Sequence, residues 1–287
     1  MKKFLRNGLF LSIFIVVSMA FLPPQTIDTL HNGASEKEAA TSKPKPAVNF
    51  DAGEELVYEI YYNLNFVWIP AGEVNFKVFD KDAEYHISAS GRTYSSYEWF
   101  FKVRDQYDSY IDKNTLLPNM SIRDVSEGKY KQFSKVAYDQ NAKKAFYERG
   151  EDRNNIKAKG TLETKDLMHD VLSILYYCRT LDYDNALVGQ EYPVNILLDE
   201  AIYPLKYKIL GKEDKKIRNL GKWATIKLSP KLISGNMFKE GTEMKVWASN
   251  DANKVPLMIE SPVSVGSVKI VLKSWKGLKY PTTAKKD

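Results

Sequence analysis

The sequence predicts a mainly β fold, in which antiparallel curved sheets form a β-sandwich or a closed or half-open β-barrel. Two observations indicate this class. From Phe50 onward, short runs of aromatic and β-branched residues alternate with polar residues, which is the pattern of half-buried strands. These runs recur at short and regular spacing, as they do in sandwiches and barrels. One amphipathic helix, near residues 164–179, is inserted among them.

The clearest strand is expected over residues 72–79, where Val74, Phe76 and Val78 share one face and polar residues alternate with them. Further strands are expected over residues 56–62, 85–92, 106–111, 120–125, 133–138, 144–147, 192–198, 205–210, 223–228, 243–248, 255–260 and 268–275. No internal repeat and no composition shift divides this region, so we expect a single β-rich domain over residues 50–280.

The expected helix over residues 164–179 has one broad apolar face. Asp170, Ser173 and Tyr177 fall on the opposite side, where we expect them to contact loops or water. Thr164 suits the N-cap position, because its hydroxyl can accept from the first free backbone N–H groups. A second, shorter helix is predicted within residues 95–102.

The first 20 residues have the three parts of a secretory signal. Lys2 and Lys3 precede an apolar stretch from Leu9 to Val17, and small residues lead up to Ala20. An uncleaved membrane anchor is the alternative, but the apolar run is shorter than the roughly 20 residues that a bilayer span needs. We therefore expect a signal peptide over residues 1–20 and a periplasmic or extracellular protein with no transmembrane span after leader removal.

The segment after the leader, residues 21–49, predicts a disordered linker, because it is poor in apolar residues and rich in charge and proline. The only cysteine is Cys178, which excludes a lipid-modified N-terminus and an internal disulfide. The protein is therefore not expected to be a lipoprotein, and Cys178 is interpreted as a small buried apolar residue.

Charge gives little indication of a partner. The formal net charge is +6, and loss of Lys2, Lys3 and Arg6 with the leader leaves about +3. The basic residues are scattered among nearly as many acidic ones, whereas nucleic-acid readers concentrate them on one face. We expect no nucleic-acid binding.

Four short motifs together resemble a known family. They are Gly53-Glu54-Glu55-Leu56-Val57-Tyr58 with Pro70-Ala71-Gly72-Glu73, residues 105–112 with Leu117-Pro118, Asp170-Val171-Leu172-Ser173 through Tyr177 and Arg179, and residues 246–251 with Val255-Pro256. In this order they are similar to exported bacterial proteins called domain of unknown function 3108. The resemblance implies a curved or barrel-like antiparallel β architecture in the cell envelope, and it implies no established activity. By fold analogy alone, half-open β barrels with a helix at the mouth are similar to periplasmic carriers of lipids or lipoproteins.

No motif predicts catalysis, a metal or a cofactor. His169, Asp170 and Ser173 lie on one helix, where neighbours rarely reach the geometry of a catalytic triad. Asp105, Asp108 and Asp112 lack the spacing of a calcium loop. Accordingly, we assign no catalytic residue, no metal ligand and no cofactor.

Aromatic residues are the most informative feature for binding, with 18 Tyr, 13 Phe and 5 Trp. Such residues line ligand cavities and sugar-stacking surfaces, although most of them form ordinary core and rim. The predicted ligand-binding residues are Trp68, Tyr97, Trp99, Phe100 and Phe101 from the aromatic positions, and Asp170, Ser173, Tyr177 and Arg179 from the helix.

Two hypotheses of function follow, ahead of an enzyme. The first is an exported, non-catalytic envelope protein that binds or carries an apolar or amphiphilic ligand, such as a lipid, lipoprotein or glycan, in a β cavity. The second is a structural or interaction protein of the envelope with a protein or glycan partner. The first predicts a cavity lined by aromatic residues, and the second predicts an interior with no void larger than a few waters. The oligomeric state is left open.

Overall fold

The computed structural model describes residues 47–64, 67–99, 101–232, 244–262 and 266–286. Within these ranges the fold is one antiparallel sheet of fifteen strands. The strands are β1 Glu55–Leu64, β2 Val67–Lys81, β3 Glu84–Thr93, β4 Val103–Asp112, β5 Pro118–Glu127, β6 Tyr130–Asp139, β7 Lys144–Asp152, β8 Asn155–Glu163, β9 Glu191–Leu198, β10 Ala201–Ile217, β11 Gly221–Leu232, β12 Lys245–Ser249, β13 Pro256–Pro262, β14 Ser267–Lys276 and β15 Lys285–Lys286. The helices are α2 Ser95–Glu98 and α3 Val171–Arg179.

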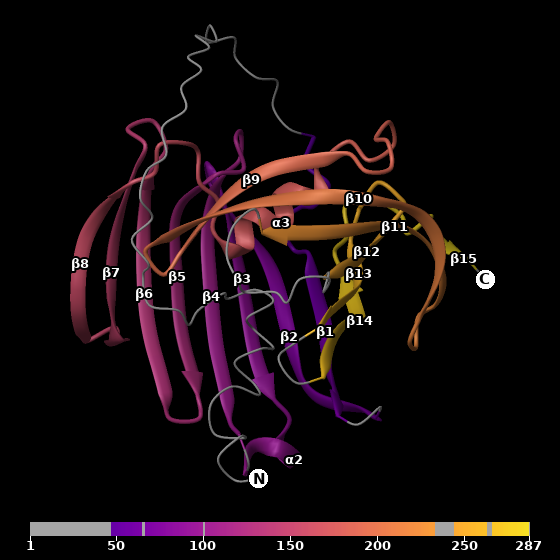
Figure 1. The fold of residues 1–287 in the computed structure, drawn as a ribbon, viewed down its shortest axis with the longest axis horizontal. Helices are drawn as coiled ribbons and strands as arrows, with labels where there is room; N and C mark the ends of the chain where they lie inside the picture. The colour runs from indigo at the N-terminus through magenta and orange to yellow at the C-terminus, as the bar shows by residue number, and fades with distance from the viewer. Residues whose placement is uncertain (1–46, 65–66, 100, 233–243, 263–265, 287) are drawn as a thin grey trace, which may run out of the picture.

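The sheet consists of two meanders joined at one seam. Its strand order is β8-β7-β6-β5-β4-β3-β2-β1-β14-β13-β12-β11-β10-β9, with β15 added to β11. The seam is the antiparallel pairing of β1 with β14, which runs from Glu55↔Lys276 to Asn63↔Ser267. The sheet curls so far that β9, β10 and β11 pass over the helix α3 (Figure 1). The predicted mainly β class is therefore confirmed, and its form is a single unclosed half-barrel.

Strand alternation follows the sequence pattern. In β4 every second side chain is buried, from Val103 through Asp105 to Ile111, and these residues form the concave face. On the edge strand β8, Lys157 and Lys159 are exposed between half-buried residues. Charged residues at an edge discourage pairing with another chain.

The helix α3 begins later than the sequence predicted. The predicted start and the N-cap at Thr164 are wrong, because the backbone near His169 pairs with β9 instead: His169 N–H donates to Asn195 O, and Leu197 N–H donates to His169 O, both at 2.9 Å. Asp170 is the N-cap, and its carboxylate accepts from Leu172 N at 2.7 Å. The short helix predicted within residues 95–102 is confirmed as α2.

The side of α3 predicted to be polar is enclosed rather than open to loops and water. His169, Asp170 and Ser173 are all buried, because the sheet curls over the helix. Cys178 is also buried, as expected, and burial raises the pKa of its thiol to about 12. The core between helix and sheet includes Phe50, Ile87, Ile111, Leu172, Trp223 and Leu272.

A buried ion pair holds the C-terminal end of α3. Arg179 Nη1 lies 2.6 Å from Glu54 Oε1, and the two side chains are only 3% and 0% exposed. Arg179 Nη2 also donates to Glu54 Oε2 at 2.8 Å. The guanidinium donates further to the backbone oxygens of Asn253 and Asn49. One side chain thus joins the helix to the start of β1 and to two loops.

We expect Glu54→Gln to lower the free energy of unfolding by about 3–5 kcal/mol, because it leaves the Arg179 guanidinium buried without a counter-charge. Urea denaturation followed by circular dichroism measures the change. The matched control is Glu148→Gln, which removes an exposed ion pair with Lys159 and should cost less than about 1 kcal/mol. Equal losses in the two variants would contradict the structural role of the buried pair.

Candidate functional site

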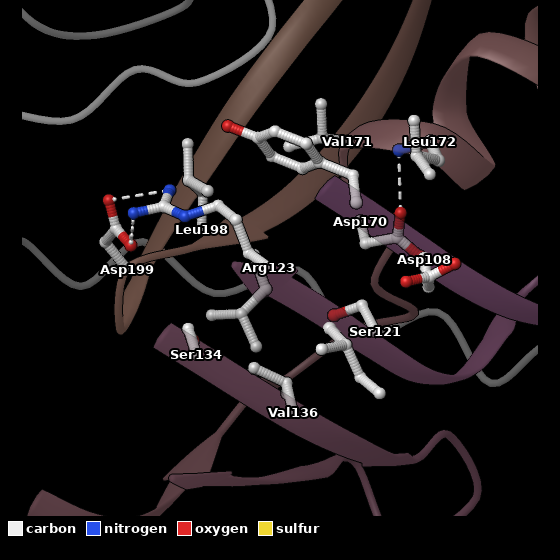
Figure 2. A pocket seen from close by; sticks show the side chains of 13 residues that line it. Asp108, Ser121, Arg123, Ser134, Val136, Asp170, Val171, Leu172, Leu198 and Asp199 are labelled. Carbon is white, nitrogen blue, oxygen red and sulfur yellow. Dashed lines mark hydrogen bonds and ion pairs between the residues drawn. The ribbon is translucent and has the colours of Figure 1, made fainter. Parts of the chain in front are cut away.

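The concave face of β4, β5 and β6 carries a small cavity beside the N-terminus of α3 and the tip of the β9–β10 hairpin (Figure 2). Its volume is about 40 Å³, which is room for about three water molecules. The lining residues are Tyr107, Asp108, Ser121, Ile122, Arg123, Ser134, Val136, Asp170, Val171, Leu172, Leu197, Leu198 and Asp199. The wall is therefore mixed, with apolar side chains and a few charged ones.

The tip of the β9–β10 hairpin is fastened to the far part of the sheet by charged side chains. Asp199 and Glu200 form the turn and both have positive φ, at 48° and 65°. Arg123 of β5 binds the Asp199 carboxylate with two nitrogens, at 2.7 and 3.1 Å, as Figure 2 shows. Gln132 Nε2 donates to the same carboxylate at 2.9 Å. Arg149 Nε lies 3.1 Å from Glu200 Oε1.

These contacts make a clamp, which we define as Arg123, Gln132 and Arg149 on the sheet with Asp199 and Glu200 on the hairpin. The clamp joins β9 and β10, at one end of the strand order, to β5, β6 and β7 near the other end. It closes the half-barrel over the cavity through side chains instead of a backbone ladder.

Next to the clamp lies a pair of buried acids, Asp105 of β4 and Glu127 of β5, each 4% exposed. Asp105 Oδ1 accepts from Ser126 N at 2.9 Å. Asp105 Oδ2 and Glu127 Oε2 meet no other donor among the described residues, so a hydrogen bond between them requires a proton on one carboxyl. Burial raises the pKa of both groups, repulsion between them raises that of Glu127 further, and Arg123 opposes the shift. The pKa is thereby raised to about 7 for Asp105 and to about 8 for Glu127.

The N-terminal end of α3 is also held to the sheet, by a buried cap. The Asp170 carboxylate accepts from Ser109 Oγ of β4 at 2.5 Å and from the Leu172 and Ser173 backbone N–H groups. The Ser173 hydroxyl accepts from Asp170 N at 2.9 Å, which completes a capping box. All of these groups are buried, so the cap also fixes the helix against β4.

His169 and Ser173 are in contact, with 3.2 Å between Nδ1 and Oγ. Burial lowers the pKa of His169 to about 4, so the imidazole is neutral. The Asp170 carboxylate points to the helix N-terminus and to Ser109, not to the imidazole. The three residues therefore cap a helix, and they do not form a relay of the catalytic-triad kind.

The four binding residues predicted on the helix do not all lie at the cavity. Asp170 lines the cavity, and Ser173 is buried just behind it. Tyr177 lies against His169, with ring centroids 4.7 Å apart. Arg179 lies at the other end of the helix, in the ion pair with Glu54.

The predicted aromatic residues lie elsewhere. Trp68 lies beneath Lys269, whose Nζ is 3.9 Å from the ring centroid. Tyr97 belongs to α2, Trp99 follows it, and Phe101 packs against Gly128. Phe100 is outside the described residues. Figure 1 places α2 at the lower end of the strands and α3 near the upper end, so the structure does not bring the two groups together.

Sequence reasoning missed the clamp. The signal that could have found part of it lies in β5, where Arg123 and Glu127 alternate in register with Val125 and must share its buried face. The three aspartates considered for calcium do not converge. Asp108 pairs with His86 at 2.8 Å, and Asp112 accepts from backbone N–H groups of its own turn. In the described ranges no three His, Cys, Asp or Glu side chains gather as metal ligands would.

The fold and site define a class: an unclosed antiparallel β half-barrel with an internal helix and a polar clamp across its open side. The chain belongs to the family described as "Protein of unknown function (DUF3108)", whose match covers residues 57–273. This confirms the family resemblance seen in the sequence. No curated protein matches the chain.

Three solved structures are similar. The β-barrel-like protein of domain of unknown function DUF1849 from Brucella abortus has a TM-score of 0.56 at 6% identity, over 81% of this chain and 100% of that one. A protein described as exported, with a YmcC-like fold, from Bacteroides fragilis has a TM-score of 0.32 at 7% identity, over 81% and 99%. A protein described as a lipoprotein from Parabacteroides distasonis has a TM-score of 0.31 at 10% identity, over 82% and 100%. The first likeness supports the fold alone.

Neither helix in the described part of the chain has the length and apolar composition needed to cross a membrane.

We expect the acid pair to make stability fall as pH rises. Both carboxyl pKa values are raised above their unfolded values near 4. Between pH about 4 and pH about 8, the folded protein therefore binds more protons than the unfolded chain does. The stability from this source is fully present below pH about 4 and is lost as pH rises through about 7 and about 8.

The measurement compares urea midpoints at acidic and alkaline pH for the native protein and the Asp105→Asn/Glu127→Gln variant, which should lose this dependence. Asp108→Asn is the control, because the pKa of Asp108 is shifted in the opposite direction. Burial acts to raise the pKa of Asp108, but the hydrogen bonds from His86 and Gln106 lower it overall. Its stability contribution is therefore lost on acidification. A native protein and double variant with parallel pH profiles would contradict the assignment.

Proposed function

We propose that this protein is an exported, non-catalytic binding protein of the cell envelope that holds an apolar or amphiphilic ligand in its half-barrel, under the β9–β10 hairpin. The observation that carries the proposal is the clamp. The tip of the hairpin is joined to the far strands of the sheet by side chains and not by a continuous backbone ladder. Its opening breaks the clamp and the packing of Leu197, and a wider opening also breaks the two backbone hydrogen bonds between β9 and His169. Residues 1–20 support export, because they have the parts of a secretory signal.

The lining of the cavity indicates the chemistry of the ligand. Val136, Leu172 and Leu198 offer apolar contacts, and Arg123 supplies a buried positive charge at the hairpin side. A mixed wall of this kind suits a molecule with an apolar part and a polar or anionic group. The cavity of about 40 Å³ is far smaller than a lipid, so binding requires the hairpin to move.

The second candidate is a structural or interaction protein of the envelope with a protein or glycan partner. The small size of the same cavity favours it, because an interior with voids of only a few waters is what a packed scaffold requires. The two candidates differ in whether the hairpin opens.

The first test is native mass spectrometry of the protein secreted from an exporting host, followed by lipid analysis of the extract. The carrier proposal expects a co-purifying amphiphile, or uptake of one from a panel of phospholipids, lysolipids and fatty acids. A clean apo mass that resists loading with the whole panel would exclude the carrier function and favour the interaction protein.

We further expect weakening of the clamp to speed ligand exchange. Asp199→Asn/Glu200→Gln removes the charges that bind Arg123 and Arg149, and loss of one charge-assisted hydrogen bond corresponds to about a tenfold change or more. Stopped-flow uptake of a fluorescent fatty acid measures the rate. Asp214→Asn is the matched control. Asp214 lies on β10, away from the hairpin tip, and its substitution removes exposed ion pairs with Lys222 and Lys286. A faster rate in the control as well would show that the clamp is not the gate.

A further inference from the structure

The loop that joins β3 to β4 exposes a large apolar side chain. Trp99, which follows α2, is 84% exposed, and α2 itself contributes no buried residue. The indole Nε1 donates to Ser96 O at 2.9 Å. The only polar group of the side chain is therefore satisfied within its own loop, and the surface that the ring presents outward is apolar.

This loop forms one surface with the β5–β6 turn. The Phe101 ring lies against Gly128, where a Cβ would be 3.1 Å from the ring and φ is +59°. Gly128 N donates to Lys102 O at 2.8 Å. The side chains of Lys102, Lys129 and Lys131 are exposed around this contact. We call Trp99 and these three lysines the α2 rim.

The α2 rim carries more positive than negative charge, although Glu98 also interacts electrostatically with Lys102. Arg104 is paired with Glu98, whereas no ion pair in the described ranges involves Lys102, Lys129 or Lys131. A second exposed apolar side chain, Val67 at 60% exposure, belongs to the start of β2. Figure 1 places the start of β2 at the same lower end of the sheet as α2.

We propose that the α2 rim docks on the surface of an anionic lipid bilayer. Tryptophan favours the boundary between headgroups and acyl chains, where an apolar ring can be buried. Lysines near the surface are attracted by anionic headgroups, and this attraction weakens as salt screens it. The combination of an outward apolar ring with a satisfied N–H and three exposed lysines fits such a surface in both hydrophobicity and charge.

A bilayer fits the rim better than a glycan or a protein does. Sugar-stacking rings need polar side chains aimed at hydroxyl groups beside the ring, whereas the exposed polar members of this rim are lysines, which donate hydrogen bonds but do not accept them. The proposal does not rest on ligand binding in the half-barrel, because the α2 rim uses exposed side chains around α2 and the β5–β6 turn and none of the residues that line the cavity. Figure 1 shows α2 at the lower end of the strands and α3 near their upper end.

The test is flotation of the secreted protein with vesicles of phosphatidylcholine alone or with added phosphatidylglycerol, at low and high salt. We expect binding only to the anionic vesicles, and a loss of about tenfold for Trp99→Ser and for Lys102→Glu/Lys129→Glu. A blue shift of tryptophan emission that is absent in Trp99→Ser reports insertion of this ring.

The control variant is Leu187→Ser/Val188→Ser, which removes two side chains that are 75% and 74% exposed in the loop before β9. It should bind vesicles as the native protein does, and circular dichroism verifies that each variant is folded. The proposal is overturned if anionic vesicles fail to bind the native protein, if Trp99→Ser binds equally well, or if the control loses binding to the same extent. Selective binding to a glycan or to a protein in place of vesicles would also overturn it.

Discussion

The buried pair of Arg179 and Glu54 is the interaction on which the arrangement of this molecule depends. It fixes one end of α3 to the first strand, and the Asp170 cap fixes the other end to Ser109 of β4. Burying such charges has a large desolvation cost, so the pair contributes more to the choice of one geometry than to net stability. The helix is thus fixed at both ends, and the sheet curls around it and packs against it. The cavity lies beside the first residues of the helix.

The clamp and the acid pair are one electrostatic system because they share Arg123. This guanidinium binds Asp199 directly, and it also opposes the rise in the pKa values of Asp105 and Glu127. While both carboxyls of the pair are protonated, the positive charge of Arg123 acts mainly on the Asp199 carboxylate at the hairpin tip. When the pair ionises, two further carboxylates attract the same guanidinium, and its hold on Asp199 is shared.

Local periodicity in the sequence predicted most strands and the presence of the helix. It did not predict features that depend on contacts between segments far apart in the chain. Alternation in β2 and β4 predicted strands, because each strand reports its own buried face. The start of α3 was misplaced because residues near His169 pair with β9, a contact with a segment more than twenty residues away. The clamp was missed for the same reason, since Arg123 and Asp199 are separated by 76 positions. Only the placement of Arg123 beside Val125 was visible locally.

The pairing of β1 with β14 has a consequence for how the chain acquires its structure. Strands β1 to β8 can form in succession as each hairpin closes, because their contacts are between neighbours in sequence. The strand that pairs with the other edge of β1 is β14, which cannot form until residues 267–276 have been synthesised. Until then, one hydrogen-bonding edge of the first strand has no partner strand, so the sheet cannot be completed before the last part of the chain is available. Folding of this protein is thus completed only when its last strands are available. Before then, the unpaired edge of β1 is open to aggregation.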